Sequence, residues 1–183
     1  MTQILYITAT SAVVATVVGF LLNALQMRIA ERRSARLEAL QAAVSLEGFA
    51  ISCADAISDH DTAVESEGHA GRLFGPLPEL PTLGISVGLL RPRRATVANR
   101  LAVFPQEVQQ SKQAANFWWD VVGDMDAARN AAKYEAAHLG LSSLGLARDL
   151  RSAFGLPTRS LVFGKWDVAA SLLNVAENDP RRE

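Results

Sequence analysis

The side chains that could do chemistry are concentrated between Asp55 and His69, a stretch with carboxylates and imidazoles but no lysine or arginine. Asp55 and Asp59 are four residues apart, so a helix would place them one turn apart on one face. Carboxylate and imidazole groups are ligands for divalent metals. The pattern therefore makes Asp55, Asp59, His60 and His69 candidate metal ligands.

A second candidate pair, Glu135 and His138, has the Glu-x-x-His spacing of helical bundles that hold two metal ions. Those bundles repeat the pair on two helices, whereas this chain has it once. The alternative interpretation is that all these residues cap helix ends or stay solvated, as Asp, Ser and His often do. The acidic stretch could also dock a basic partner. A metal-dependent enzyme or sensor is thus the second of two functional hypotheses.

Patterns for other kinds of catalysis are weak in the sequence. Cys53 and His60 would lie two helical turns apart, about 10 Å, beyond hydrogen-bond reach. A Gly-x-Ser-x-Gly pattern occurs once, at residues 84–88, but it lies in the Pro/Gly-rich stretch and not between a predicted strand and a helix. There is no phosphate-cradling glycine loop or His-Glu-x-x-His motif. The sequence therefore favours a protein without catalytic activity and without a resident cofactor.

The strongest signal lies at the N-terminus, where residues 1–27 contain no charged side chain. A helix needs about 20 apolar residues to cross a bilayer, so we expect a single-pass transmembrane helix over residues 4–25. A cleaved secretory signal would carry its basic residues before a shorter apolar run. Here the basic residues follow it: Arg28, Arg32, Arg33 and Arg36. Arginines beside a span stay in the cytoplasm, which predicts an N-terminus outside and a cytoplasmic C-terminal domain.

Composition adds a few bounds on location and partners. A net charge of −1 disfavours nucleic-acid binding. The single cysteine, Cys53, fits a reducing cytosol. Arginine greatly outnumbers lysine, which indicates a GC-rich bacterial background and hence the bacterial inner membrane. The small residues Ser11, Ala15 and Gly19 recur every fourth position, a spacing that would allow two helices to pair closely, although small residues are common in any span. They are candidates for self-association.

The chain divides by composition into an anchor (1–27), a juxtamembrane helix (28–64), a Pro/Gly-rich connection (65–92), further helices (93–176) and a frayed tail (177–183). No proline interrupts the first two segments, so we expect one helix of about 50 residues, bent at Gly48 and ending near Ser58. The connection is rich in leucine. It should therefore be ordered, lying along the helices or a partner.

The remaining helices are predicted from their caps and breakers. A short helix should reach Val103, with a new one starting at Pro105 and ending at Gly123. Asp124 should cap a helix that Gly155-Leu156-Pro157 stops, and a last helix should begin at Lys165.

The predicted fold class is all-α, a transmembrane helix that continues into a cytoplasmic helical bundle. The preferred function is a membrane-tethered interaction module, acting as scaffold, docking partner or accessory subunit. Its expected partners are the lipid bilayer and either another protein or a second copy of the chain.

Overall fold

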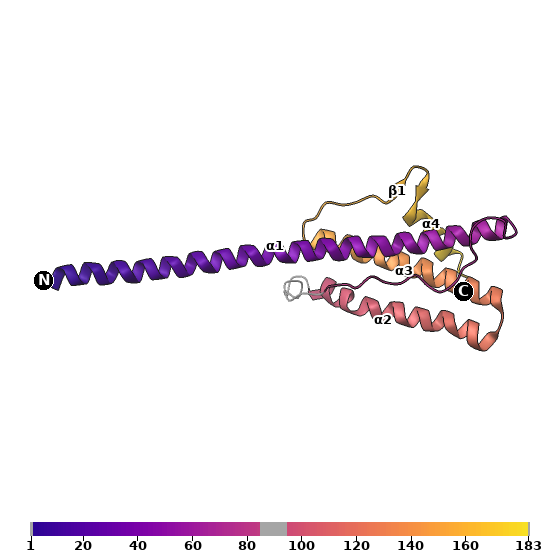
Figure 1. Cartoon of the computed structure of the whole chain (residues 1–183), viewed down its shortest axis with the longest axis horizontal. Helices are drawn as coiled ribbons and strands as arrows, with labels where there is room; N and C mark the ends of the chain where they lie inside the picture. Colours follow the sequence, from indigo (N-terminus) through magenta and orange to yellow (C-terminus); the bar gives the residue numbers. More distant parts are fainter. Residues whose placement is uncertain (1, 85–94, 183) are drawn as a thin grey trace.

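The computed structural model describes residues 2–84 and 95–182. These residues are mostly helical, with almost no sheet, as the sequence predicts. The four α-helices are α1 (Thr2–Glu65), α2 (Ala95–Phe117), α3 (Met125–Ala153) and α4 (Val168–Glu177). The C-terminal half of α1 packs against α3, and its N-terminal half projects alone from one end of the bundle (Figure 1).

The long helix α1 runs through Gly48 without interruption and ends two turns beyond the predicted Ser58. It continues because its buried face continues: Ile57, His60 and Ala63 all lie against the rest of the bundle. Side chains three residues apart share one face of a helix. The helix then ends in a turn in which the Gly68 amide donates to the Ala63 carbonyl at 2.8 Å.

The connection after α1 begins with turns, then has no helix or strand from Arg72 to Gly84, and Phe74 and Leu77 are buried against the bundle. The rest of the predicted connection, residues 85–92, lies outside the described residues. Gly71 determines where the connection turns back toward α1. A Cβ there would lie 2.3 Å from the Asp59 carbonyl oxygen, and its φ of 74° also favours glycine. The glycine therefore lets the chain turn back directly against α1.

One prediction is wrong at Pro105, which lies inside α2 and does not begin a new helix. Proline removes one helical hydrogen bond and crowds the preceding turn. The buried face offsets this cost, since Leu101, Phe104 and Val108 are buried on both sides of the proline while Pro105 is exposed. Phe104 also meets Phe49 of α1 edge to face, with ring centroids 6.1 Å apart.

The α2–α3 connection agrees with the predicted breakers. A π-helical turn, Trp118–Val122, ends at Gly123, whose φ is 69°. The Asp124 carboxylate then caps α3 by accepting hydrogen bonds from the amides of Asp126 and Ala127. The Asp124 cap is thus confirmed, and both Trp118 and Trp119 are half-buried.

The interface between α1 and α3 is built largely from small side chains. Gly140 is buried in α3, where an added Cβ would lie 2.8 Å from a Leu172 methyl carbon and 3.3 Å from the Cys53 Cβ. Small residues let backbones approach closely, so α1, α3 and α4 meet here. The buried alanines on the two long helices are Ala35, Ala39, Ala42, Ala43, Ala50, Ala54 and Ala63 in α1, and Ala128, Ala131, Ala132, Ala136, Ala137 and Ala147 in α3.

The helix α3 ends as predicted at Gly155, whose φ is 59°. The segment that follows differs from the prediction, because Lys165 lies in a hairpin turn and not in a helix. Strand β1 (Val162–Phe163) pairs antiparallel with β2 (Trp166–Asp167), and α4 begins only after the Asp167 cap. The tail also differs from the expected frayed end, since it forms a 3-10 turn (Pro180–Arg182).

Candidate functional site

The projecting half of α1 exposes large apolar side chains that no described part of the protein covers. They are Val18, Phe20, Leu21, Leu22, Leu25, Met27 and Ile29. Phe20 is 72% exposed, and from Val18 onward the first buried residue is Ala35. By length and composition alone, the part of α1 from Val18 to Glu65 could cross a membrane, and half of the apolar window that meets this criterion is buried inside the bundle. An apolar surface of this kind marks a place where something other than water makes contact.

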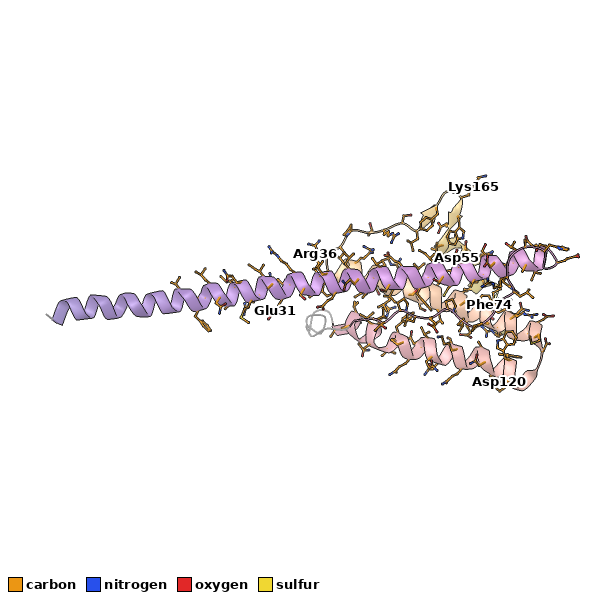
Figure 2. The ribbon with its side chains drawn as sticks, in the orientation of Figure 1. Glu31, Arg36, Asp55, Phe74, Asp120 and Lys165 are labelled. Carbon is orange, nitrogen blue, oxygen red and sulfur yellow. The ribbon has the colours of Figure 1, made fainter. Side chains whose placement is uncertain are left out.

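The four predicted membrane-flanking arginines are all exposed. Arg28 lies just before Ile29, Arg32 and Arg33 lie between Ile29 and Ala35, and Arg36 follows Ala35. Arg28, Arg32 and Arg33 make no ion pair or hydrogen bond within the described residues. Arg36 donates to the Gly155 carbonyl at 2.9 Å and so marks where the bundle begins (Figure 2).

The acidic stretch is split between surface and core. Asp55 and Asp59 are exposed on one face of α1, and partial burial together with the Asp59 charge raises the pKa of Asp55. His60 is buried, and its Nδ1 accepts a hydrogen bond from the Phe74 amide at 3.1 Å. Burial lowers the pKa of His60, with a further lowering from nearby Lys133. His60 therefore links α1 to the connection by a hydrogen bond. His69 is exposed in the turn that follows α1.

The second predicted pair is engaged with the C-terminal tail. His138 Nε2 lies 3.0 Å from Asp179 Oδ2, and Glu135 lies 3.1 Å from Arg181. Arg181 also bonds both carboxylate oxygens of Asp179, which holds the pKa of that buried carboxyl far below its ordinary value. We call Glu135, His138, Asp179 and Arg181 the tail clasp. Nothing in the local sequence signals it, because Asp179 and Arg181 sit in a stretch typical of frayed ends.

No three His, Cys, Asp or Glu side chains converge as a metal site among the residues that the structure describes. The metal hypothesis therefore stays a prediction without a gathered ligand set. Cys53 is fully buried, and burial raises the pKa of its thiol to about 12. The thiol at this position is therefore protonated at neutral pH and packs as a small apolar group.

A buried ion pair that sequence reasoning missed joins α1 to α3. Arg151 donates from Nε to Glu47 Oε1 at 2.6 Å and from a terminal nitrogen to Oε2 at 3.0 Å. The side chains are only 7% and 5% exposed, respectively. Arg151 also donates to the Pro157 carbonyl, and the half-exposed Arg159 approaches Glu47 at 3.4 Å. The pair is thus fully bonded and positions the segment after α3.

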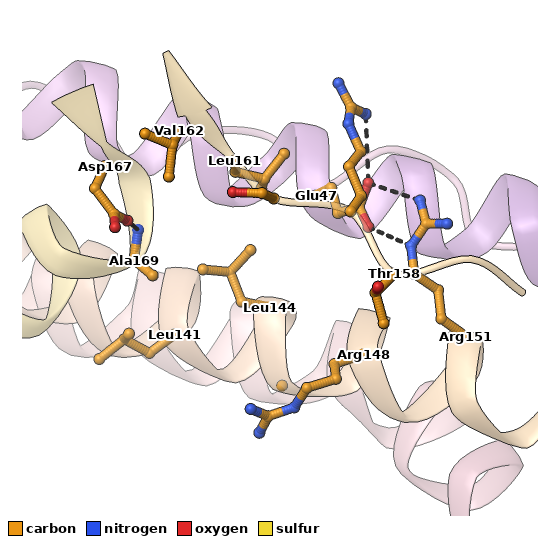
Figure 3. A pocket seen from close by; sticks show the side chains of 13 residues that line it. Glu47, Leu141, Leu144, Arg148, Arg151, Thr158, Leu161, Val162, Asp167 and Ala169 are labelled. Atoms are coloured by element: carbon orange, nitrogen blue, oxygen red, sulfur yellow. Dashed lines mark hydrogen bonds and ion pairs between the residues drawn. The ribbon is translucent and has the colours of Figure 1, made fainter. Parts of the chain in front are cut away.

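Beside this ion pair lies a pocket of about 430 Å³. Its walls come from α1, α3, the segment after α3 and the start of α4. Figure 3 shows the Glu47–Arg151 pair at one end and Asp167 at the other. The apolar lining residues are Leu141, Leu144, Leu161 and Val162.

Two features of the described residues are outside the predicted metal ligands: the exposed apolar half of α1 and the pocket beside Glu47. The predicted metal ligands contribute to neither of them. Comparison of the chain with models of protein families, with curated proteins and with solved structures gives no match.

Proposed function

We propose that this chain is a membrane-tethered helical interaction module, in which the apolar half of α1 crosses a bilayer. One observation carries the proposal: from Val18 to Ile29 the side chains of α1 are exposed or partly exposed and mostly apolar, exposed arginines begin at Arg28, and a face is buried against other helices from Ala35 onward. Water is a poor environment for the first segment, while lipid is a good one.

The dimensions agree with this assignment. A helix rises 1.5 Å per residue, so residues 2–27 extend about 40 Å, against a hydrocarbon core of about 30 Å. The arginines that follow would meet the headgroups of the cytoplasmic leaflet, where each basic side chain near the surface contributes about 1 kcal/mol. This orientation puts the N-terminus outside and the bundle in the cytoplasm, at a bacterial inner membrane.

Docking is the role that such a bundle supports best. The described residues gather no metal-binding set, and α1 runs without a break from the proposed span into the bundle. The partner would be another membrane-associated protein or a second copy of the chain. In the second case Ser11, Ala15 and Gly19, which recur every fourth residue along α1, would supply the contact.

The membrane assignment is tested by two double variants with the same added charge. Val14→Arg with Val18→Arg puts two arginines inside the span, at a cost of about 5 kcal/mol for insertion. Leu37→Arg with Val44→Arg adds the same charge at exposed positions beyond it. We expect the first variant to leave the membrane pellet on carbonate washing, while the control remains there. Release of the parent chain by the same wash would refute the anchor.

Orientation and docking need separate measurements. A reporter that is active only in the cytoplasm should be active when fused after Glu183, and one active only outside the cytoplasm should not. Chemical cross-linking in native membranes, followed by gentle detergent extraction, should yield a defined complex or a dimer. A strictly monomeric particle without a bound protein would contradict the docking role.

A further inference from the structure

We propose that the pocket beside the Glu47–Arg151 pair is a binding site for a small amphipathic anion, an apolar molecule that ends in a carboxylate. The pocket belongs to the bundle, and this inference does not depend on whether α1 crosses a membrane. Its volume of about 430 Å³ lies within the range of about 300–1,000 Å³ that small-molecule sites occupy.

The negative charges of the pocket are already used. Both oxygens of Glu47 accept hydrogen bonds from arginine, and Asp167 Oδ1 accepts two amide hydrogen bonds at the start of α4. A cationic ligand would have to displace these bonds. The pocket therefore has little to offer a cation.

Hydrogen-bond donors, in contrast, are left over on two sides of the pocket, with Arg148 directed away from Glu47 (Figure 3) and Arg159 beside it. Arg148 is exposed and makes no ion pair or hydrogen bond within the described residues, and the same holds for the hydroxyls of Thr158 and Ser160. One terminal nitrogen of Arg159 lies 3.4 Å from Glu47 Oε2, and the Arg159 side chain is 46% exposed. Guanidinium groups bind carboxylates through paired hydrogen bonds, so the spare donors select an anion.

The rest of the lining selects an apolar body. Leu141 and Leu144 of α3 line the pocket together with Leu161 and Val162, and Figure 3 shows Leu144 directed toward the segment that carries Leu161. Inorganic phosphate would leave this apolar wall in contact with water. A ligand with a short hydrocarbon part would cover the wall and place its carboxylate toward Arg159 or, on the other side of the pocket, toward Arg148.

Photolabelling can test this assignment. The full chain, in discs of neutral phosphatidylcholine, is exposed to decanoic acid that bears a diazirine, and labelled peptides are mapped after pepsin digestion. We expect label on peptides that contain residues 141–145 and 158–162. The methyl ester of the same probe keeps the tail but lacks the charge, and it should label these peptides about tenfold less.

A charge-matched pair of variants completes the test. Arg148→Gln combined with Arg159→Gln should lower pocket labelling by about tenfold or more, with helical content unchanged because both side chains lie at the surface. Arg72→Gln with Lys165→Gln removes the same charge at exposed positions outside the pocket lining and should leave labelling unchanged. Equal labelling by acid and ester, label confined to the apolar half of α1, or full labelling of the double variant would each overturn the proposal.

Discussion

The two halves of α1 are both apolar, yet their side chains are used in opposite ways. In the projecting half the large residues, such as Phe20 and Leu22, are exposed, whereas in the packed half the buried residues are mostly alanines. Large exposed side chains suit lipid, which needs only apolar surface. Small buried ones suit a close helix interface. Both halves are apolar, so hydropathy alone does not distinguish them. The size of the buried and exposed apolar side chains does.

The largest expected effect concerns the packed half, where Glu47 holds a buried arginine. Replacing Glu47 with alanine leaves the Arg151 guanidinium buried without its carboxylate, which should cost about 3–5 kcal/mol of folding free energy. The three tryptophans, Trp118, Trp119 and Trp166, all lie in the bundle, so their fluorescence during urea unfolding in detergent reports this half. Glu65→Ala, at an exposed position, is the control. A loss below 1 kcal/mol for the Glu47 variant would show that the pair is dispensable.

Replacing one leucine by alanine in each half of α1 tests whether only the packed half contributes to the stability of the bundle. Leu46 is fully buried, so Leu46→Ala should cost about 2–5 kcal/mol in the same urea experiment. Leu22 is 55% exposed and touches no core, so Leu22→Ala should leave bundle unfolding unchanged. Similar losses for both variants would mean that the projecting half packs against the bundle, contrary to Figure 1.

Acid should destabilise the bundle by protonating Asp179 in the tail clasp. The pKa of Asp179 is depressed in the folded state, so its contribution is complete above the ordinary carboxyl range. This contribution to the free energy of unfolding decreases as the pH falls below about 4, and it is lost completely once the pH is below the lowered pKa of Asp179 in the folded state. Asp179→Asn should therefore remove about 2 kcal/mol at neutral pH and flatten the acid limb of the stability profile. A parallel acid limb in the variant would assign this pH dependence to other groups.

The smallest expected effect is that of metal removal. No metal-binding group of side chains is gathered in the described residues, so we predict that the bundle folds without a metal. Dialysis against EDTA should leave the melting temperature unchanged, and Asp59→Ala with His69→Ala should behave like the parent. A fall in melting temperature on chelation, reversed by zinc or magnesium, would revive the metal hypothesis.

The parts of the fold that the sequence predicts well are those set by neighbouring residues. The unbroken course of α1 follows from the absence of proline, and the Asp124 cap and the Gly155 stop follow from local backbone chemistry. The errors arise where distant contacts decide. Pro105 stays inside a helix because Leu101 and Phe104 are buried beside it.

At the candidate site, too, the sequence fails to predict contacts between residues that are far apart along the chain. His60 has the right chemistry for a ligand, but its ring is occupied by the Phe74 amide, a contact that spacing cannot reveal. Glu47 and Arg151 lie far apart in the sequence, each in a helical pattern where a charged residue reads as solvated surface. Only the packing of α1 on α3 brings them together and creates the pocket beside them.

The unbroken backbone of α1 has a mechanical consequence. No helix break separates Ile29 from the buried turn at Ala35, so we expect the projecting half and the bundle to move together. A rotation or tilt imposed on one end would then be passed to the other. In the proposed membrane orientation this would hold the bundle at a set distance from the lipid, where a partner would have to present its own surface.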